Sequence, residues 1–225
     1  GVSSASRVAL PETLLTVIVM LTAVLVEKRS PSSIRWAGFI CGLSVAIHPR
    51  AITLVFAFLF LLVIKRGSID KRRALSGLAL GCIATILVLL VSQTWLGPRV
   101  ASSVNVIGFA ERAGVAAGQI LAIGAASGGL VLLALLSSGR SLFSKCEQIR
   151  TSEFYLVVGL LGMVVMGGWV LGGGDRPDVM LYSRYVDLWT LPLVVVAISK
   201  YEIKAFNKIQ LMGATAVAIS CAVMT

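Results

Sequence analysis

Long apolar runs, separated by short polar loops, fill nearly the whole chain. Such runs predict membrane-spanning helices, because about 20 apolar residues cross a bilayer and shorter helices can be accommodated inside a bundle. The expected spans are Pro11–Val26, Ile34–Ile47, Ala51–Ile64, Ala74–Leu96, Ala116–Leu136, Phe154–Leu171, Leu188–Ser199 and Ile209–Met224. The chain is therefore predicted to be all-α, a polytopic transmembrane helix bundle of about eight spans that forms a single domain over residues 1–225.

The second and third spans are short, and two topologies are compatible with them. In one, His48, Pro49 and Arg50 form the tip of a helical hairpin. In the other, a single kinked helix runs from Ile34 to Ile64, since Pro is tolerated in membrane helices where neighbours satisfy the freed backbone groups. The distribution of positive charge over the loops distinguishes the two.

With a hairpin at His48, most Lys and Arg residues fall on one side of the bilayer. That side receives fourteen of them: Lys28, Arg29, Arg35, Lys65, Arg66, Lys71, Arg72, Arg73, Arg140, Lys145, Arg150, Lys200, Lys204 and Lys208. The other side receives six: Arg7, Arg50, Arg99, Arg112, Arg176 and Arg184. Because cytoplasmic loops carry the excess of positive charge, we expect a multi-pass plasma-membrane segment with both termini extracytoplasmic. A kinked helix would lose this pattern.

Composition supports a membrane protein and changes the meaning of the net charge. A mean hydropathy of +0.94, with 57% hydrophobic and 13% charged residues, excludes an ordinary soluble surface. The formal charge of +10 would suggest nucleic acid in a soluble protein, but basic loops beside apolar spans are attracted to anionic lipid. We therefore expect membrane lipid as a partner and no nucleic acid.

The beginning of the chain carries neither an initiator Met nor a signal peptide, because it opens with Gly1-Val2-Ser3-Ser4. A chain that starts outside the cytoplasm without a targeting segment is expected to be the carboxy-terminal portion of a longer membrane protein. The alternative is a short processed protein whose leader has been removed.

Cysteines and glycines are interpreted as structural. The cysteines, of which three lie in apolar spans and one in a loop, are Cys41, Cys82, Cys221 and Cys146. They lack metal-ligand spacing and the chain has one His, so we expect free cysteines and no metal site. The spaced pairs Gly38 and Gly42, and Gly77 and Gly81, are typical of helix faces that pack closely in membranes.

Residues able to do chemistry gather on the predicted outer side. Glu12 follows Pro11 at a helix start, where an acid near the helix dipole is ordinary, so a local role and a substrate role both remain open. His48 and Arg50 form a polar tip partly within the membrane, which is costly without a polar partner. A function for His48 and an internal pairing with Glu12 are both compatible with this position.

The segment Asp175–Asp187 holds the densest group of polar residues: three acids, two arginines and two tyrosines in thirteen positions. Arg184 can present its planar fork to a phosphate or carboxylate. The flanking Tyr182 and Tyr185 offer hydrogen bonds and a surface for a sugar or a lipid headgroup, although Tyr is also common at membrane interfaces. Asp187 follows three residues after Arg184, at the start of a span.

Three of these motifs resemble one family. The His-Pro-Arg turn, the opening Pro11-Glu12, and Tyr182-Ser183-Arg184-Tyr185-Val186-Asp187 followed by Leu-Trp-Thr-Leu-Pro are similar to multispanning actinobacterial membrane proteins related to GT-C glycosyltransferases. Those relatives commonly read Tyr-Gly-Arg-Tyr-Val-Glu, so Ser183 and Asp187 replace a Gly and a Glu here. The resemblance covers most of the chain.

The resemblance implies transfer of a sugar from a polyprenyl-phosphate donor to a glycan or protein acceptor outside the cytoplasm. No cofactor is expected, since such enzymes use no nucleotide-sugar site. Substrate-binding candidates are Arg184 and Arg50 for the donor phosphate, His48, Tyr182 and Tyr185 for the sugar, and the acids Glu12 and Asp187. Fixed cations would stabilise the charge that develops on the leaving phosphate. The family's catalytic acid lies in a first outer loop that has no counterpart here, so the catalytic residue stays unknown.

Two other classes remain open. A secondary transporter would need broken helices and polar groups near the bilayer midplane, ideally repeated in two halves, yet the spans contain almost no ionisable residue at mid-depth and no clear repeat. A noncatalytic membrane assembly subunit would account for the glycine-rich faces, but it would not explain the cluster of Arg and Tyr residues on the outer side.

Overall fold

A computed structural model describes residues 4–64, 69–92, 108–127, 129–132, 135, 150–171 and 187–200 of the chain. All regular elements in this part are helical: α1 (Ser4–Lys28), α2 (Pro31–Ser44), the 3-10 turn η1 (Pro49–Ala51), α3 (Ile52–Ile64), α4 (Lys71–Ser92), α5 (Phe109–Ala126), α7 (Thr151–Leu171) and α8 (Asp187–Lys200). The all-α prediction is confirmed for these residues.

The helices overlap seven of the expected spans, and the last expected span, Ile209–Met224, lies outside the described residues. In the described part, two helical stretches are long and apolar enough to cross a membrane, Lys71–Val91 and Thr151–Gly168. The apolar helix Ile52–Ile64 is shorter. A bundle of eight spans therefore stays a prediction.

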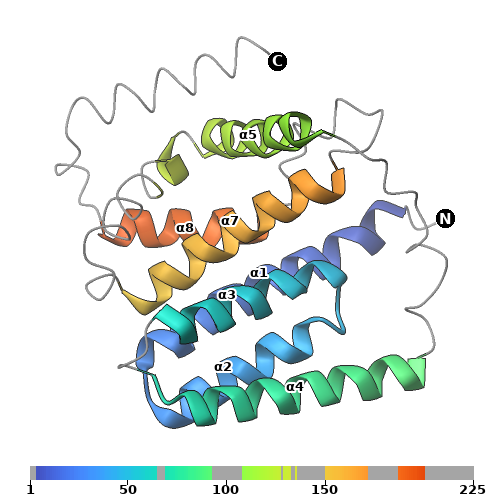
Figure 1. The fold of residues 1–225 in the computed structure, drawn as a ribbon, viewed down its shortest axis with the longest axis vertical. Coiled ribbons are helices and arrows are strands. Elements are labelled where there is room, and N and C mark those ends of the chain that lie inside the picture. Colours follow the sequence, from blue (N-terminus) through green and yellow to red (C-terminus); the bar gives the residue numbers. More distant parts are fainter. Residues whose placement is uncertain are drawn as a thin grey trace. The chain divides into compact units, whose positions relative to one another are not determined.

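The chain divides into two compact units, and the first comprises residues 1–103 and 150–159. Its helices α1 to α4 run alternately in opposite directions (Figure 1). α3 returns alongside α2 after a break at residues 45–51, so the hairpin is confirmed and the single kinked helix is wrong. Whether the two units form one domain stays a prediction.

Local signals explain where the helices of the first unit begin and end. Arg29 has a φ of 51°, the left-handed conformation that commonly follows a helix end, and it terminates α1. The Ser30 hydroxyl accepts a hydrogen bond from the Ser33 N–H (3.2 Å) and Pro31 takes the first helical position of α2. Asp70 caps the start of α4 in the same way as Ser30 caps α2, because its carboxylate accepts a hydrogen bond from the Arg73 N–H (3.2 Å).

The closest helix contact in the first unit is between α2 and α4. A Cβ at Gly38 would lie 2.5 Å from the Ala74 carbonyl oxygen, and one at Gly42 would lie 2.7 Å from the Cys82 nitrogen. From the other side, a Cβ at Gly77 or Gly81 would lie even closer to the α2 backbone, at the carbonyls of Arg35 and Phe39. The glycine spacing thus forms a backbone-to-backbone seam, as predicted.

The second unit comprises residues 104–149 and 160–225, of which the structure describes α5, the later part of α7, and α8. α5 approaches α7 at two glycines: a Cβ at Gly168 would lie 2.8 Å from the Arg112 carbonyl oxygen, and one at Gly167 would meet the amide of Gln119. Gln119 is fully buried. In α8, Trp189 and Leu193 are fully buried and Pro192 lies inside the helix.

Candidate functional site

The turn between α2 and α3 carries the first pair of candidate site residues. After α2, the Ala46 and Ile47 N–H groups bond back to the carbonyls of Leu43 and Ser44, at 3.0 Å each. Pro49 follows, and it has no N–H with which to continue a helix. The chain therefore leaves α2 in a tight turn and restarts as α3.

Side chains then stabilise this turn. His48 Nδ1 accepts a hydrogen bond from the Arg50 N–H (3.1 Å), and Thr53 Oγ1 donates to the Arg50 carbonyl (2.9 Å). Because Nδ1 is the acceptor, the proton of the neutral imidazole is on Nε2. His48 and Arg50 are both half-buried. The turn thus holds a hydrogen-bond donor and a cation two residues apart at one end of the first unit.

The helical backbone places Glu12 toward the same end of the helices. Across the α1 and α2 interface, the Cys41 thiol contacts Thr22 Oγ1 at 4.0 Å. From this pair α2 continues three residues to its end at Ser44, just before His48, and Glu12 lies ten residues back along α1, which runs in the opposite direction, so both lie on the same side of the contact. This register is compatible with the pairing of Glu12 and His48, although only the backbone of Glu12 is described.

The other candidates belong to the second unit. Tyr182, Arg184 and Tyr185 lie outside the described residues, and Asp187 is the first residue of α8, with only its backbone described. Their convergence with the His48 turn therefore stays a prediction.

The opposite end of the first unit is strongly basic. α1 ends there, α2 and α4 begin there, and α7 joins it, because the Glu27 carboxylate accepts hydrogen bonds from the Ser152 N–H (2.9 Å) and hydroxyl (2.8 Å). The described cations at this end are Lys28, Arg29, Arg35, Lys71, Arg72, Arg73 and Arg150. The described acids near them are Glu27, Asp70 and Glu153. Asp70 also lies 3.4 Å from the Arg73 Nε.

The sequence did not show the contact between Glu27 and Ser152. The start of α7 is recognisable from Thr151, Ser152 and Glu153 ahead of an apolar run, which is a typical helix beginning. However, the acid that accepts from this N-terminus lies on α1, 125 residues earlier in the chain. No local pattern indicates such a partner.

A small polar cluster lies inside the first unit. The Cys41 sulfur is 3.7 Å from the Tyr155 hydroxyl in addition to its contact with Thr22, and all three side chains are buried. Cys41 and Cys82 are free, as expected. The described residues contain no group of three His, Cys, Asp or Glu side chains that could hold a metal ion. Cys41 therefore serves as a packed, weakly hydrogen-bonded core residue.

No family model, curated protein or solved structure matches the chain. The resemblance to GT-C glycosyltransferases thus rests on the short motifs alone and stays a prediction.

Proposed function

We propose that the chain is a multi-pass plasma-membrane protein that transfers a sugar from a polyprenyl-phosphate donor to a glycan or protein acceptor outside the cytoplasm. The observation that carries the membrane part of this proposal is the arrangement of the first unit. Seven of its described cations gather at one end, the turn with His48 and Arg50 occupies the other, and apolar side chains are exposed between them.

The surface of α4 favours a lipid environment. Its 22 residues rise about 33 Å, close to the thickness of a bilayer hydrocarbon core. Large apolar side chains on this helix are exposed in succession, including Ile83 (53%), Leu87 (57%), Leu90 (68%) and Val91 (86%). A contiguous apolar surface of this kind is rare on soluble monomers and is satisfied in a membrane.

The difference between the two ends supports an orientation. Seven described cations lie at the end formed by the starts of α2 and α4, whereas the opposite end has the His48 and Arg50 turn. The rule that cytoplasmic loops are positive puts the basic end in the cytoplasm. The His48 turn then faces the extracytoplasmic side, which is where a polyprenyl-phosphate donor would be used.

At that side, each candidate has a defined task. Arg50 and Arg184 would bind the donor phosphate and stabilise the charge that develops on it as the sugar leaves. The Nε2 proton of His48, with the hydroxyls of Tyr182 and Tyr185, would orient the sugar. Glu12 and Asp187 would accept hydrogen bonds from sugar hydroxyls or pair with the arginines.

The test is sugar transfer by membranes from the native cell in which the protein carries Arg184→Ala. Transfer from radiolabelled polyprenyl-phosphate sugar is expected to fall below detection while expression and membrane insertion stay normal. The matched control is Arg176→Ala, which removes a cation from the same expected loop but outside the Tyr-Ser-Arg-Tyr motif, and should retain transfer.

Near-normal transfer by the Arg184→Ala protein would contradict the assignment of Arg184 to the donor phosphate. Absence of transfer and of lipid-phosphate binding by the wild-type protein would overturn the enzyme proposal and favour a noncatalytic assembly subunit.

A further inference from the structure

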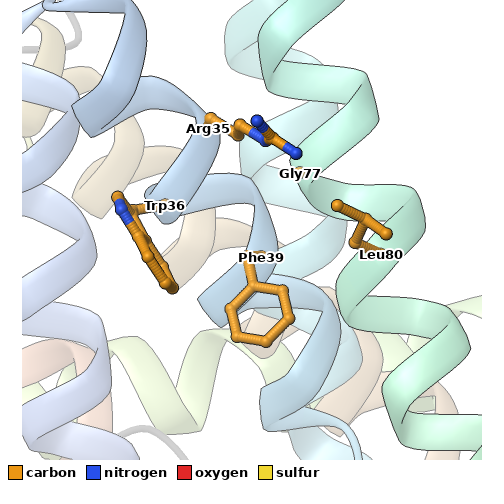
Figure 2. Close-up of a pocket in the computed structure, with 5 residues that line it drawn as sticks. All are labelled: Arg35, Trp36, Phe39, Gly77 and Leu80. Atoms are coloured by element: carbon orange, nitrogen blue, oxygen red, sulfur yellow. The ribbon is translucent and has the colours of Figure 1, made fainter.

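A cavity opens between α2 and α4 near the basic end of the first unit. It has a volume of about 330 Å³ and is lined by Arg35, Trp36, Phe39, Gly77 and Leu80 (Figure 2). This volume is at the lower end of the range typical of small-molecule sites, about 300–1,000 Å³. One cation and two aromatic rings thus border an otherwise apolar space.

The α2 and α4 seam fixes the floor of this cavity. A Cβ at Gly77 would collide with the carbonyl of Arg35, so the two backbones touch there and cannot separate without losing the seam. Figure 2 shows the Arg35 side chain reaching toward α4 beside Gly77, while Phe39 and Leu80 lie further along the two helices. The Trp36 and Phe39 rings meet edge to face, with their centroids 5.5 Å apart, and this contact fixes the aromatic wall.

The charge at the cavity is positive and can bind an anionic ligand. Arg35 is exposed, and its guanidinium forms no hydrogen bond or ion pair with any other residue that the structure describes, whereas Arg73 nearby is held by Asp70. Lys71 and Arg72 add positive charge at the start of α4. An arginine fork suits a phosphate, to which it can donate two parallel hydrogen bonds.

An apolar surface continues from the cavity along α4. Leu80 lines the cavity and is 44% exposed, and helical spacing puts Ile83 and Leu87, 53% and 57% exposed, on the same face. This strip runs toward the middle of the proposed bilayer. A soluble phosphate would leave the strip uncovered, while an acyl chain would cover it.

We infer that this cavity binds one anionic phospholipid of the cytoplasmic leaflet, with its phosphate on Arg35 and an acyl chain along Leu80, Ile83 and Leu87. The inference rests on the membrane orientation of the proposed function but is independent of glycosyl transfer. Basic pockets between membrane helices on the cytoplasmic side are suited to such headgroups. Trp36 then lies at the depth where indole rings concentrate in membranes.

The experiment is quenching of Trp36 fluorescence in the full chain, reconstituted in phosphatidylcholine vesicles. The Trp36 signal is the difference between wild-type protein and the Trp36→Phe variant, which removes the contributions of the other tryptophans. A small fraction of lipid carries bromine on its acyl chains, either as phosphatidylglycerol or as phosphatidylcholine. We expect brominated phosphatidylglycerol to quench Trp36 at about ten-fold lower mole fraction, the effect of a charge-assisted hydrogen-bonded pair.

Three variants test whether Arg35 causes the preference for phosphatidylglycerol. Arg35→Gln should abolish the preference, and Arg35→Lys should retain only part of it, since an ammonium keeps the charge but loses the planar fork. Arg72→Gln is the matched control, because it removes an equal charge at the same end from a residue that does not line the cavity. It should leave the preference in place.

The opposite results overturn the inference in distinguishable ways. Equal quenching by both brominated lipids, or an equal loss with Arg72→Gln, would replace the site by diffuse surface attraction and leave the membrane assignment intact. Relief of quenching by water-soluble glycerol phosphate would mean a soluble ligand instead of a lipid. No quenching of Trp36 by either lipid would contradict the membrane assignment as well.

Discussion

Two helix contacts in this protein use glycine in different ways. Between α2 and α4, glycines on both helices face backbone atoms, so that a Cβ at Gly81 would collide with the Phe39 carbonyl and lie 3.0 Å from Gly42 Cα. Between α5 and α7, a Cβ at Gly167 would meet the side-chain amide of Gln119, at 2.6 Å from Oε1. The first contact joins backbone to backbone at every one of these glycines, whereas the second combines a backbone approach at Gly168 with a flexible polar side chain at Gly167.

The polar groups at the two contacts differ as well. At the seam, Thr85 Oγ1 donates a hydrogen bond of 2.8 Å to the Gly42 carbonyl, so the buried hydroxyl is satisfied. At the other contact, neither Gln119 Oε1 nor Nε2 has a hydrogen-bond partner among the described residues. Close approach at the seam therefore supports stability, whereas burying the unpaired amide of Gln119 lowers the stability of the second unit.

The largest effect is expected for Gly81→Ala at the seam. Because the neighbouring atoms are backbone and cannot rotate away, the free energy of unfolding should fall by about 1–3 kcal/mol, the usual cost of overpacking. The measurement is reversible unfolding of the purified protein in detergent micelles.

The matched control for Gly81→Ala is Gly162→Ala, another glycine inside a helix but with no atom within 4 Å of the added Cβ. It should raise the free energy of unfolding by about 0.5–1 kcal/mol, since Ala favours helix over Gly. If Gly81→Ala changed the free energy of unfolding no more unfavourably than Gly162→Ala, the contact between α2 and α4 would not be rigid.

An intermediate effect is expected for Thr85→Val, which keeps the shape of the side chain and removes the hydrogen bond to Gly42. The loss should be about 0.6–1.7 kcal/mol, as for other hydrogen bonds between membrane helices. Ser76→Ala is the control, because Ser76 bonds within its own helix at an exposed position, to the Arg73 carbonyl. The same unfolding measurement is made on both variants. An equal change in the free energy of unfolding would show that the Thr85 hydrogen bond adds no stability.

The smallest effect is expected for Gln119→Met in the second unit. Replacing a buried amide that lacks partners by an apolar side chain of similar length should leave the free energy of unfolding unchanged or raise it by about 1 kcal/mol. Thermal unfolding followed by tryptophan fluorescence would detect either result. A fall in the free energy of unfolding by more than about 1 kcal/mol would show that Gln119 is hydrogen-bonded in the folded protein.

The elements of the fold were largely predictable. Apolar runs located the helices, the positive loops favoured a break at His48 over a kinked helix, and the spacing of Gly38 and Gly42 predicted a packing face. These features depend on a few neighbouring residues and on how each segment interacts with lipid or water, so a single sequence contains them. The predicted ends of the helices were less accurate. α5 begins at Phe109, well before the expected Ala116, because polar residues in its first turns interrupt the apolar pattern that marks a helix.

The candidate site was predictable only in part. His48 and Arg50 are close in sequence, and their turn followed from Pro49 between two apolar runs. That Glu12 lies toward the same end of the helices could not be read from the sequence, because it depends on the antiparallel pairing of α1 and α2 that the contact between Thr22 and Cys41 shows.

By itself, the sequence determined the helical class, the helix break at Pro49 and the separation of positive charge along the chain, because these are set by local composition and periodicity. Only the tertiary structure decided that Glu27 caps α7, that Arg35 and Trp36 border a cavity with Leu80, and that Gln119 is buried against Gly167. Each of these pairs two helices at one rotation and one register, and a periodic apolar pattern is compatible with many such pairings.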